Sequence, residues 1–435
     1  MKDHTAVLID HYFGRDGGEL RLGGHPVTRL AAQFGTPLFI YDASVLQRKW
    51  QILRETLPDT FKIFYSVKAN PNQAILRFFL ERGCGLEVAS GGEFYRALKS
   101  GALPENIFFA GPGKTESELE LVLKQGIGEI HIESCVEASR VIAICRRLGV
   151  TAKVAVRVNP QVEVQGGAMR MGGKSAPFGI DEEQVDLLID ELVQAPCVDV
   201  RGIHLFTGTQ ILDHQLLLAQ YRHAVEIARQ IAGRLGRPLR TVDLGGGLGI
   251  PYFSHEQPLN MDSVREHLAG LMSEIRHDPL FAGTQFIVEP GRYLVGEAGI
   301  YVTRITDIKV SRGKKFFILD GGMHHHLAAS GNLGQVIKRN FPIAVITKLD
   351  QKLADVSDLV GPLCTPLDTV ARELPVPYAE VGDLIGIFQS GAYARWASPL
   401  GFLSHPTPPE VLVSNDDVRL ITRRGTYDDM FLDVL

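Results

Sequence analysis

The sequence of 435 residues lacks the features that mark membrane proteins and nucleic-acid-binding proteins. No apolar run is long enough to span a bilayer, and the chain does not begin with the charged-then-apolar pattern of a signal peptide. Basic and acidic residues are mixed along the chain and give a formal net charge of −5, so no basic surface is indicated. We therefore expect neither a membrane nor a nucleic acid as a partner.

Cysteine is also scarce, and its spacing argues against a disulfide framework. The chain has five cysteines and no Cys-x-x-Cys pair, which indicates free thiols in a reducing compartment. This predicts a cytoplasmic protein. The remaining composition, 45% hydrophobic and 22% charged, is typical of a globular protein, and the length favours two domains.

The most informative stretch runs from Phe61 to Asn72. It is an apolar run of about strand length that ends in Lys68 and is followed at once by a turn signal, Asn70-Pro71. Lys68 is therefore expected at the carboxyl end of a buried strand, where desolvation would lower the pKa of its ammonium group. A neutral amine at that position suits Schiff-base chemistry. The alternative is a lysine that merely extends to solvent from a strand end.

Strands and helices alternate along the next two hundred or so residues. This order predicts a parallel sheet covered by helices, and eight units over roughly 230 residues match a (β/α)8 barrel, with an open doubly wound sheet as the alternative. The predicted strands are Lys62–Val67, Leu86–Ala89, Ile107–Ala110, Glu129–Ile132, Lys153–Val158, Val200–Phe206, Thr241–Leu244 and Gln285–Glu289. Predicted helices between them include Gln73–Arg82, Glu116–Gln125, Val136–Leu148 and Leu216–Leu235.

The regions on either side of this alternation have another pattern. After Glu289, short strand-like runs without long helices predict a mostly antiparallel β domain. These runs are Gly299–Val310, Lys315–Leu319, Ala344–Lys348, Leu384–Phe388 and Val411–Val413. Before the barrel, the sequence predicts helices over His25–Phe34 and Val45–Leu57, with a strand over Pro37–Tyr41 between them.

Charged residues and glycines stand where the predicted barrel strands end, which is where barrels of this kind place their active sites. The strand ends carry Lys68, Glu87, Arg157, His204–Gln210, Gly245–Gly249 and Glu289–Arg292. The glycines at 245–247 free backbone N–H groups to approach phosphate oxygens, although such clusters also form ordinary tight turns. Glu289 is either an ion-pair partner of Arg292 or a carboxylate that keeps a pyridine nitrogen protonated, which makes a pyridine cofactor an electron sink.

These motifs, in this order, resemble the fold-type III pyridoxal-phosphate decarboxylases, which include diaminopimelate, ornithine and arginine decarboxylases. The stretches that carry the resemblance are Tyr65–Asn70, Gly202–Gln210, Asp243–Gly247, Glu289–Arg292, Gly361–Cys364 and Gly391–Tyr393. The resemblance implies an α/β fold with an alanine-racemase-like (β/α)8 barrel over residues 41–295. It also implies a β domain built from residues 296–435 and the N-terminal segment 1–40, and a homodimer with shared active sites.

The resemblance also implies roles for single residues. Lys68 would bind pyridoxal 5'-phosphate as a Schiff base, Glu289 would face its pyridine nitrogen, and Cys364 of the partner chain would protonate the carbanion left by loss of CO₂. Arg292 would meet either the phosphate or a substrate carboxylate. Other residues expected around the cofactor are Glu87, Arg157, Phe206, Thr209, Gly246, Gly247, Gly291 and Tyr393. Substrate contacts are expected from Arg292, Thr365, Asp368 and Tyr393, and no metal is expected.

Two departures from the family pattern bear on the substrate. The family often has a glutamate after the cysteine, where it grips the distal amine of diaminopimelate; here Thr365 follows Cys364. The family's ring-stacking histidine is replaced by Phe206, which can stack but cannot donate a proton. His204, two residues earlier, is interpreted as a strand histidine and not as a substitute.

These departures resemble the subgroup that decarboxylates carrier-linked or conjugated amino acids, including a glutamyl-carrier-protein decarboxylase. The matching stretches are Met169–Gly173, Phe206–Gln210, Pro251–Glu256, Gly322–His326 and Leu403–Pro408. The favoured function is α-decarboxylation of such an amino acid in a specialised biosynthetic pathway. The expected partner is a small-molecule amino acid or amino-acid conjugate, or an acyl carrier protein that carries the amino acid. The alternative is diaminopimelate decarboxylation.

Two functions of other classes are disfavoured. A racemase of this fold places an arginine at the pyridine nitrogen, whereas this chain has Glu289. A non-catalytic pyridoxal-phosphate protein would not need both Lys68 and Cys364. The triple histidine His324–His326 suggests a metal, but on a strand successive side chains point to opposite faces, so the three cannot chelate one ion.

Overall fold

In the computed structural model of the chain, the described residues are 4–161, 169–170, 175–333, 335 and 338–435. Of the motifs above, Met171, Gly172 and Gly173 lie outside them. The chain divides into two compact units, here called the β unit (Met1–Trp50, Pro251–Gln257 and Arg292–Leu435) and the barrel unit (Gln51–Ile250 and Pro258–Gly291). These bounds describe compactness and not independent folding, so the predicted domain boundaries stay a prediction.

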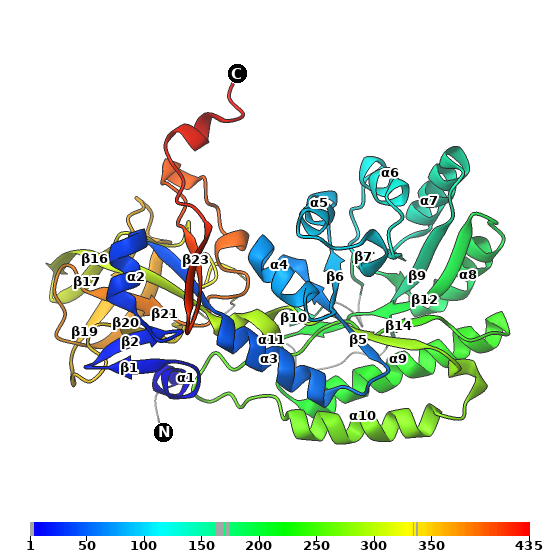
Figure 1. Cartoon of the computed structure of the whole chain (residues 1–435), viewed down its shortest axis with the longest axis horizontal. Helices are drawn as coiled ribbons and strands as arrows, with labels where there is room; N and C mark the ends of the chain where they lie inside the picture. Colours follow the sequence, from blue (N-terminus) through cyan, green and yellow to red (C-terminus); the bar gives the residue numbers. More distant parts are fainter. Residues whose placement is uncertain (1–3, 162–168, 171–174, 334, 336–337) are drawn as a thin grey trace. The chain divides into compact units, whose positions relative to one another are not determined.

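Eight parallel strands form a closed ring in the barrel unit, which confirms the predicted fold. Figure 1 labels several of these strands. Their order around the ring follows their order in the chain, and β8 closes the ring by pairing with β9. The strands are β5 (Phe61–Ser66), β6 (Gly85–Val88), β7 (Ile107–Phe109), β8 (Glu129–Ile132), β9 (Ala152–Asn159), β12 (Val198–Leu205), β14 (Thr241–Asp243) and β15 (Gln285–Val288). Each begins and ends within two residues of its prediction.

Three short strands accompany the ring. β11 (Ile180–Asp181) pairs with β9 in parallel, and β10 (Met169–Arg170) pairs with β13 (Gly208–Thr209) in antiparallel orientation. The ring strands are almost wholly buried, as strands covered on both faces must be.

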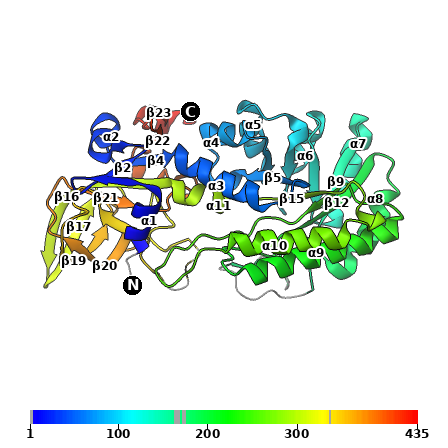
Figure 2. The ribbon, with the colours of Figure 1, turned by 60° about the horizontal axis from the view of Figure 1, so that its bottom comes forward.

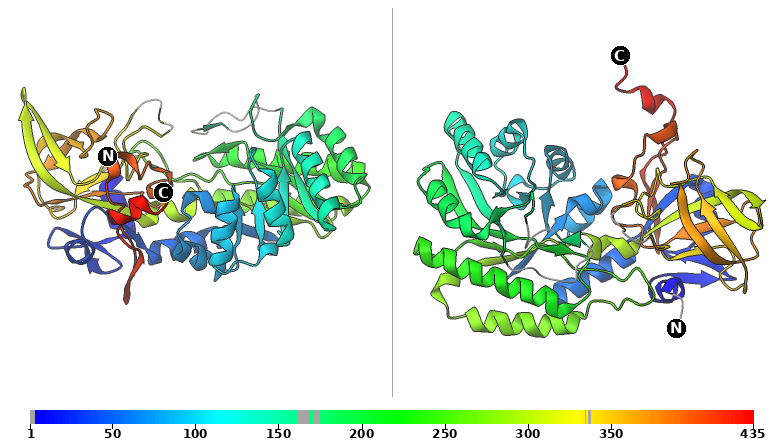
Figure 3. Two further views of the ribbon diagram at one scale, coloured as in Figure 1. Left: turned by 90° about the horizontal axis from the view of Figure 1, so that it is seen from above. Right: turned by 180° about the vertical axis from the view of Figure 1, so that it is seen from behind.

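Helices surround the strands of the barrel unit, as two further directions of view show (Figures 2 and 3). They are α4 (Gln73–Leu80), α5 (Gly91–Lys99), α6 (Glu116–Lys124), α7 (Cys135–Leu148), α8 (Val185–Val193), α9 (His214–Leu235) and α10 (Met261–Ile275). Several begin at side-chain caps; Thr115 forms a capping box with Glu118 at the start of α6, and Ser134 caps α7. Among the described residues, no helix combines the length and the apolarity needed to cross a bilayer.

The β unit contains a mostly antiparallel sheet, as predicted. Its main path is β20-β19-β17-β16-β4-β22-β23, and β21 pairs with both β16 and β18. The strands are β4 (Leu38–Asp42), β16 (Gly299–Ser311), β17 (Lys314–Leu319), β18 (Ile343–Val345), β19 (Leu353–Val360), β20 (Thr369–Pro377), β21 (Leu384–Ile387), β22 (Glu410–Ser414) and β23 (Asp417–Thr422). Because β4 pairs with β16 and β22, residues from both ends of the chain share this sheet.

The N-terminal part of the chain covers one side of the core of the β unit. It forms α1 (His4–Tyr12), α2 (Val27–Phe34) and a small sheet of β1 (Gly14–Asp16), β2 (Glu19–Leu22) and β3 (His25–Pro26). Leu8, Leu20 and Val27 from these elements pack in one core with residues of β4, β16 and β22. The helix α3 (Ala43–Thr56) then leads into the barrel unit.

The sequence reading missed several elements of the β unit. It did not predict α1 or the strands β19, β20 and β23. β20 contains Pro375 and Pro377, which argue against a strand in the sequence although proline is accepted near the end of an edge strand. The placement of His324–His326 on a strand is wrong, since these residues lie in and beside a turn.

Candidate active site

Lys68 follows β5 directly, in the single 3-10 turn η1 (Val67–Ala69), at the strand end where the sequence predicts it. Its Nζ donates to both carboxylate oxygens of Glu87, at 3.2 and 3.1 Å, and Ser66 Oγ donates to the same carboxylate. The Glu87 side chain is 1% exposed, but that of Lys68 is 41% exposed. The expected desolvation of the Lys68 ammonium is therefore wrong for this chain, and the amine is instead paired with a buried acid.

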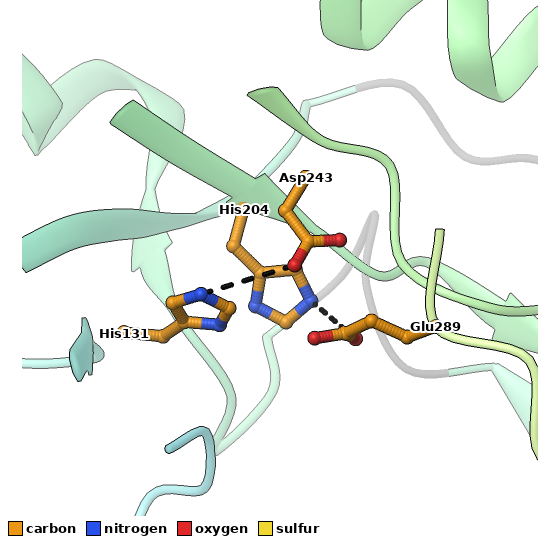
Figure 4. Close-up of side chains that lie close together, drawn as sticks. All are labelled: His131, His204, Asp243 and Glu289. Carbon is orange, nitrogen blue, oxygen red and sulfur yellow. Dashed lines mark ion pairs between the residues drawn. The ribbon is translucent and has the colours of Figure 1, made fainter. Parts of the chain in front are cut away.

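Four buried side chains from four strands of the ring meet inside the barrel (Figure 4). His131 lies on β8, His204 on β12, Asp243 on β14, and Glu289 directly follows β15. His204 Nε2 is 3.2 Å from Glu289 Oε2, and His131 Nε2 is 3.9 Å from Asp243 Oδ2. The four candidate ligand atoms all lie within 4.8 Å of one another. Such donor types also occur in metal sites, so the predicted absence of a metal stays a prediction.

Burial and mutual contact decide the charges in this group. Burial and the Glu289 carboxylate raise the pKa of Asp243 well above its ordinary value. Burial lowers the pKa of His204 to about 4, so its imidazole is neutral near pH 7. Burial by itself raises the pKa of Glu289, but His204, His131 and Lys68 outweigh it, and the pKa lies below its ordinary value. Asp243 and Glu289 therefore share one proton, with Glu289 as the ionised member.

The loop after β14 is shaped by three successive glycines. Gly245 and Gly247 have positive φ angles of 67° and 92°, which favour glycine. A Cβ atom on Gly246 would lie 2.5 Å from the carbonyl oxygen of Glu289, so only glycine fits there. Glu289 N donates to Gly245 O at 2.8 Å, and this bond ties the loop to the end of β15.

Phe206 joins this loop to the lysine. A Cβ on Gly245 would lie 2.9 Å from Cδ2 of Phe206, so the ring packs closely against the loop. The Lys68 Nζ is 5.8 Å from the centre of the same ring. His204, two residues earlier, lies on β12, which confirms its interpretation as a strand histidine.

Three other predicted residues of the barrel unit lie at strand ends. Arg157 on β9 is buried and donates from Nη1 to Glu133 Oε1 at 2.8 Å. Thr209 is half-buried on β13. Gly291 lies beside the lysine turn, because a Cβ there would be 3.0 Å from Cβ of Ala69.

Arg292 and Tyr393 belong to the β unit, where they lie together. The Arg292 guanidinium carbon is 4.8 Å from the ring centre of Tyr393, and Nη1 donates to Tyr252 Oη at 2.9 Å. Nε of Arg292 is buried and has no hydrogen-bond partner among the described residues. Tyr393 has a φ of 53°, an unusual value for a residue other than glycine, which marks a fixed local geometry.

Cys364 and Thr365 lie on the loop between β19 and β20, also in the β unit. Cys364 is a free, exposed thiol, and Thr365 is half-buried. Asp368 shapes this loop: its carboxylate, 2% exposed, accepts from the backbone N–H groups of Met323 and Leu363 at 2.6 and 2.9 Å. These bonds account for its burial, and its predicted contact with substrate stays a prediction.

Residues 43–296 match the family model described as "Pyridoxal-dependent decarboxylase, pyridoxal binding domain". The chain belongs to this decarboxylase family. The decarboxylase is 38% identical over 408 residues to the L-glutamyl-[BtrI acyl-carrier protein] decarboxylase of Niallia circulans, covering 93% of this chain and 95% of that protein. It is 32% identical over 415 residues to the diaminopimelate decarboxylase of Aquifex aeolicus, covering 94% of each chain.

Solved structures agree with the assignment. The crystal structure of diaminopimelate decarboxylase from M. jannaschii superposes with a TM-score of 0.90 at 27% identity, covering 99% of this chain and 98% of that one. The decarboxylase is therefore a carboxy-lyase that uses pyridoxal 5'-phosphate, with the alanine-racemase-like fold of these relatives.

The residues present fit this cofactor. Oε1 of Glu289 is buried and has no hydrogen-bond partner among the described residues, so an acceptor is available for a pyridinium N–H group. The loop of Gly245–Gly247 has no room for side chains at its centre and has backbone amides suited to a phosphate. A lysine amine, Lys68, lies beside the ring of Phe206.

Two members of the buried group were not given roles from the sequence. His131 lies in an apolar run, and Asp243 was quoted only as part of a motif. The sequence did contain a sign that His131 faces the inside of the barrel. Glu129 and His131 alternate with isoleucines on β8, so the two polar side chains share one face of the strand. In a barrel covered by helices, a polar face on a short buried strand must point into the ring.

Proposed function

We propose that the decarboxylase removes the α-carboxylate of an amino acid whose side chain is tethered to a carrier protein or otherwise conjugated, such as a glutamyl group on an acyl carrier protein. The observation that carries this proposal is the greater identity to the glutamyl-carrier decarboxylase, 38%, than to the diaminopimelate decarboxylase of Aquifex aeolicus, 32%, at nearly equal coverage. Thr365 supports it, since a neutral side chain stands where a glutamate would bind a distal ammonium.

The residues of the barrel unit have the following proposed roles. Pyridoxal phosphate, when bound, supplies a protonated pyridine ring that stabilises the negative charge left on the α-carbon by loss of CO₂. Lys68 holds the cofactor covalently, and Glu289 keeps the pyridine nitrogen protonated. Phe206 packs against the pyridine ring of the cofactor. The amides of Gly246 and Gly247 hold the phosphate together with Thr209, and Glu87, Arg157 and Gly291 lie elsewhere around the cofactor.

The β unit supplies the proposed substrate contacts. Arg292 binds the phosphate or a carboxylate, Tyr393 lies beside the cofactor, and Thr365 and Asp368 face the side chain of the substrate. Cys364 donates the proton that replaces CO₂ at the α-carbon. As part of the same proposal, Cys364 acts in the site of the partner subunit of a homodimer, and the enzyme works in the cytoplasm.

A substrate panel tests the proposal. We measure kcat/KM of the wild type for free diaminopimelate, lysine, glutamate and a glutamyl thioester of phosphopantetheine, with Thr365→Glu as the comparison variant. The wild type is expected to prefer the thioester. Thr365→Glu is expected to raise relative activity toward diaminopimelate by roughly ten- to a hundredfold, since a charge-assisted hydrogen bond contributes about 1.5–3 kcal/mol. A wild type that strongly prefers diaminopimelate refutes the proposal and restores the alternative.

A further inference from the structure

Three cationic side chains surround a small cavity of the β unit beside the β19–β20 loop. The cavity, about 290 Å³, is lined by Ala329, Ser330, Lys338–Asn340 and Thr369–Arg372. Among the described residues, none that lines it carries a carboxylate. We call Lys338, Arg339 and Arg372 the cationic rim. All three are exposed, and within the described part of the chain none of them forms an ion pair with a carboxylate.

Neutral contacts hold the Arg339 side chain and the backbone of Arg372. The Arg339 guanidinium carbon lies 5.2 Å from the ring centre of Phe253, and its Nη1 is 3.1 Å from Nε2 of His255. The side-chain amide of Asn340 donates to Arg372 O at 2.7 Å and accepts from Arg372 N at 2.9 Å. These contacts position the Arg339 guanidinium and the backbone that carries Arg372, while most N–H donors of the two side chains stay available to an anion.

The cationic rim is joined to the loop that carries Cys364 and Thr365. Lys338 Nζ donates to Asn332 Oδ1 at 2.5 Å, and Asn332 Nδ2 donates to Leu367 O at 3.1 Å. A single side chain therefore connects Lys338 to the loop. Thr369, which lines the cavity, follows Thr365 by only four residues.

A larger, partly apolar cavity adjoins this one in the same unit. It measures about 770 Å³, shares Arg339 and Asn340 with the smaller cavity, and is also lined by Ile9, Tyr252, Phe341 and Val345. The two cavities together suit a long, flexible ligand with one strongly anionic group. A free amino acid is too short to need both.

We propose that the cationic rim binds the phosphate of the pantetheine-type arm that tethers the amino acid to its carrier. This inference rests on the proposed function and deepens it. Arginine recognises phosphate through paired N–H donors, and three cations without acidic partners stand out on a chain whose formal net charge is −5. Phosphate is favoured over a protein carboxylate because the cations converge on one small cavity.

The test uses the holoenzyme and two substrates that differ only in the phosphate: the glutamyl thioesters of pantetheine and of 4'-phosphopantetheine. The wild type is expected to have a kcat/KM roughly tenfold or more higher for the phosphorylated thioester, mainly through KM. The double variant Arg339→Ala/Arg372→Ala is expected to reduce this ratio to about one. Lys309→Ala, at an exposed lysine on β16, is the matched control and keeps the wild-type ratio.

Calorimetric titration of 4'-phosphopantetheine alone into holoenzyme gives a second measurement. Binding by the wild type and its loss in the double variant, at unchanged melting temperature, support the inference. Equal kcat/KM for the two thioesters, or a ratio that the double variant does not change, overturns it while the proposed function stands. Failure on both thioesters with high activity on diaminopimelate overturns the proposed function and the inference together. The inference is also overturned if the double variant changes activity on the carrier-bound substrate but not on the free thioester, because the anion that the rim binds is then on the surface of the carrier.

Discussion

Replacing His204 by leucine tests whether the buried group inside the barrel controls cofactor binding through Glu289. The two side chains are 2% and 4% exposed, with His204 Nε2 at 3.2 Å from Glu289 Oε2. Because burial lowers the pKa of His204 to about 4, the imidazole near pH 7 is a neutral polar neighbour in close contact with the Glu289 carboxylate. Near pH 7 the contact is then not a buried ion pair, whose disruption costs about 3–5 kcal/mol, and we expect it to contribute about 1.5–3 kcal/mol, as polar contacts with a charged group do.

This magnitude predicts a roughly ten- to a hundredfold weaker affinity for pyridoxal phosphate in His204→Leu, if the lost stabilisation of ionised Glu289 is felt at the pyridine nitrogen. The assay is titration of apoprotein with cofactor, followed by absorbance between pH 6 and 9. His204→Gln is the matched control, because it keeps an N–H donor without a titrating ring, and it is expected to retain most of the affinity. Equal affinity and an unchanged pH profile in the leucine variant would refute the reasoning.

Three further predictions concern the cofactor lysine, the subunits and the buried histidines. Borohydride treatment of the holoenzyme is expected to fix the cofactor on Lys68, and Lys68→Ala to abolish turnover; peptide mapping to another lysine contradicts the assignment. Mixing inactive Lys68→Ala with inactive Cys364→Ala is expected to restore part of the activity through hybrid dimers, and no recovery after verified subunit exchange contradicts a shared site. Burial lowers the pKa values of His324, His325 and His326 to about 4, 2 and 3. Below pH 6.5 the unfolded chain therefore binds more protons than the folded chain. The free energy of unfolding then falls with falling pH by up to about 1.4 kcal/mol per pH unit for each histidine. Melting temperatures at pH 7 and pH 5 are expected to differ less in His324→Gln than in the wild type, and an equal difference contradicts the prediction.

The barrel could be predicted from the sequence because its strands are short apolar runs at regular spacing. Burial on both faces makes each strand a nearly continuous hydrophobic segment, bounded by turn residues. The strand ends were therefore placed within two residues, and with them Lys68, Glu87 and the glycines at 245–247. The β unit was predicted less completely, since strands such as β19 alternate irregularly between buried and exposed residues.

The charges in the site could not be predicted from strand positions. Lys68 was expected to be desolvated because it ends a buried strand, but Glu87 on the adjacent strand β6 accepts a hydrogen bond from it. That pairing depends on the register between β5 and β6, in which Ser66 stands opposite Glu87. A sequence pattern locates the end of each strand, but it does not show which side chain of the neighbouring strand lies opposite that end.

The buried group shows why this matters for catalysis. A carboxylate at the pyridine nitrogen is useful only when ionised, yet burial of Glu289 opposes ionisation. Side chains from other strands offset this burial: His204 on β12, His131 on β8, and Lys68 after β5. Asp243 on β14 keeps the proton that the pair shares. The charge that the chemistry needs on one residue is thus a property of the closed ring, because only ring closure brings β8, β12, β14 and β15 around one point.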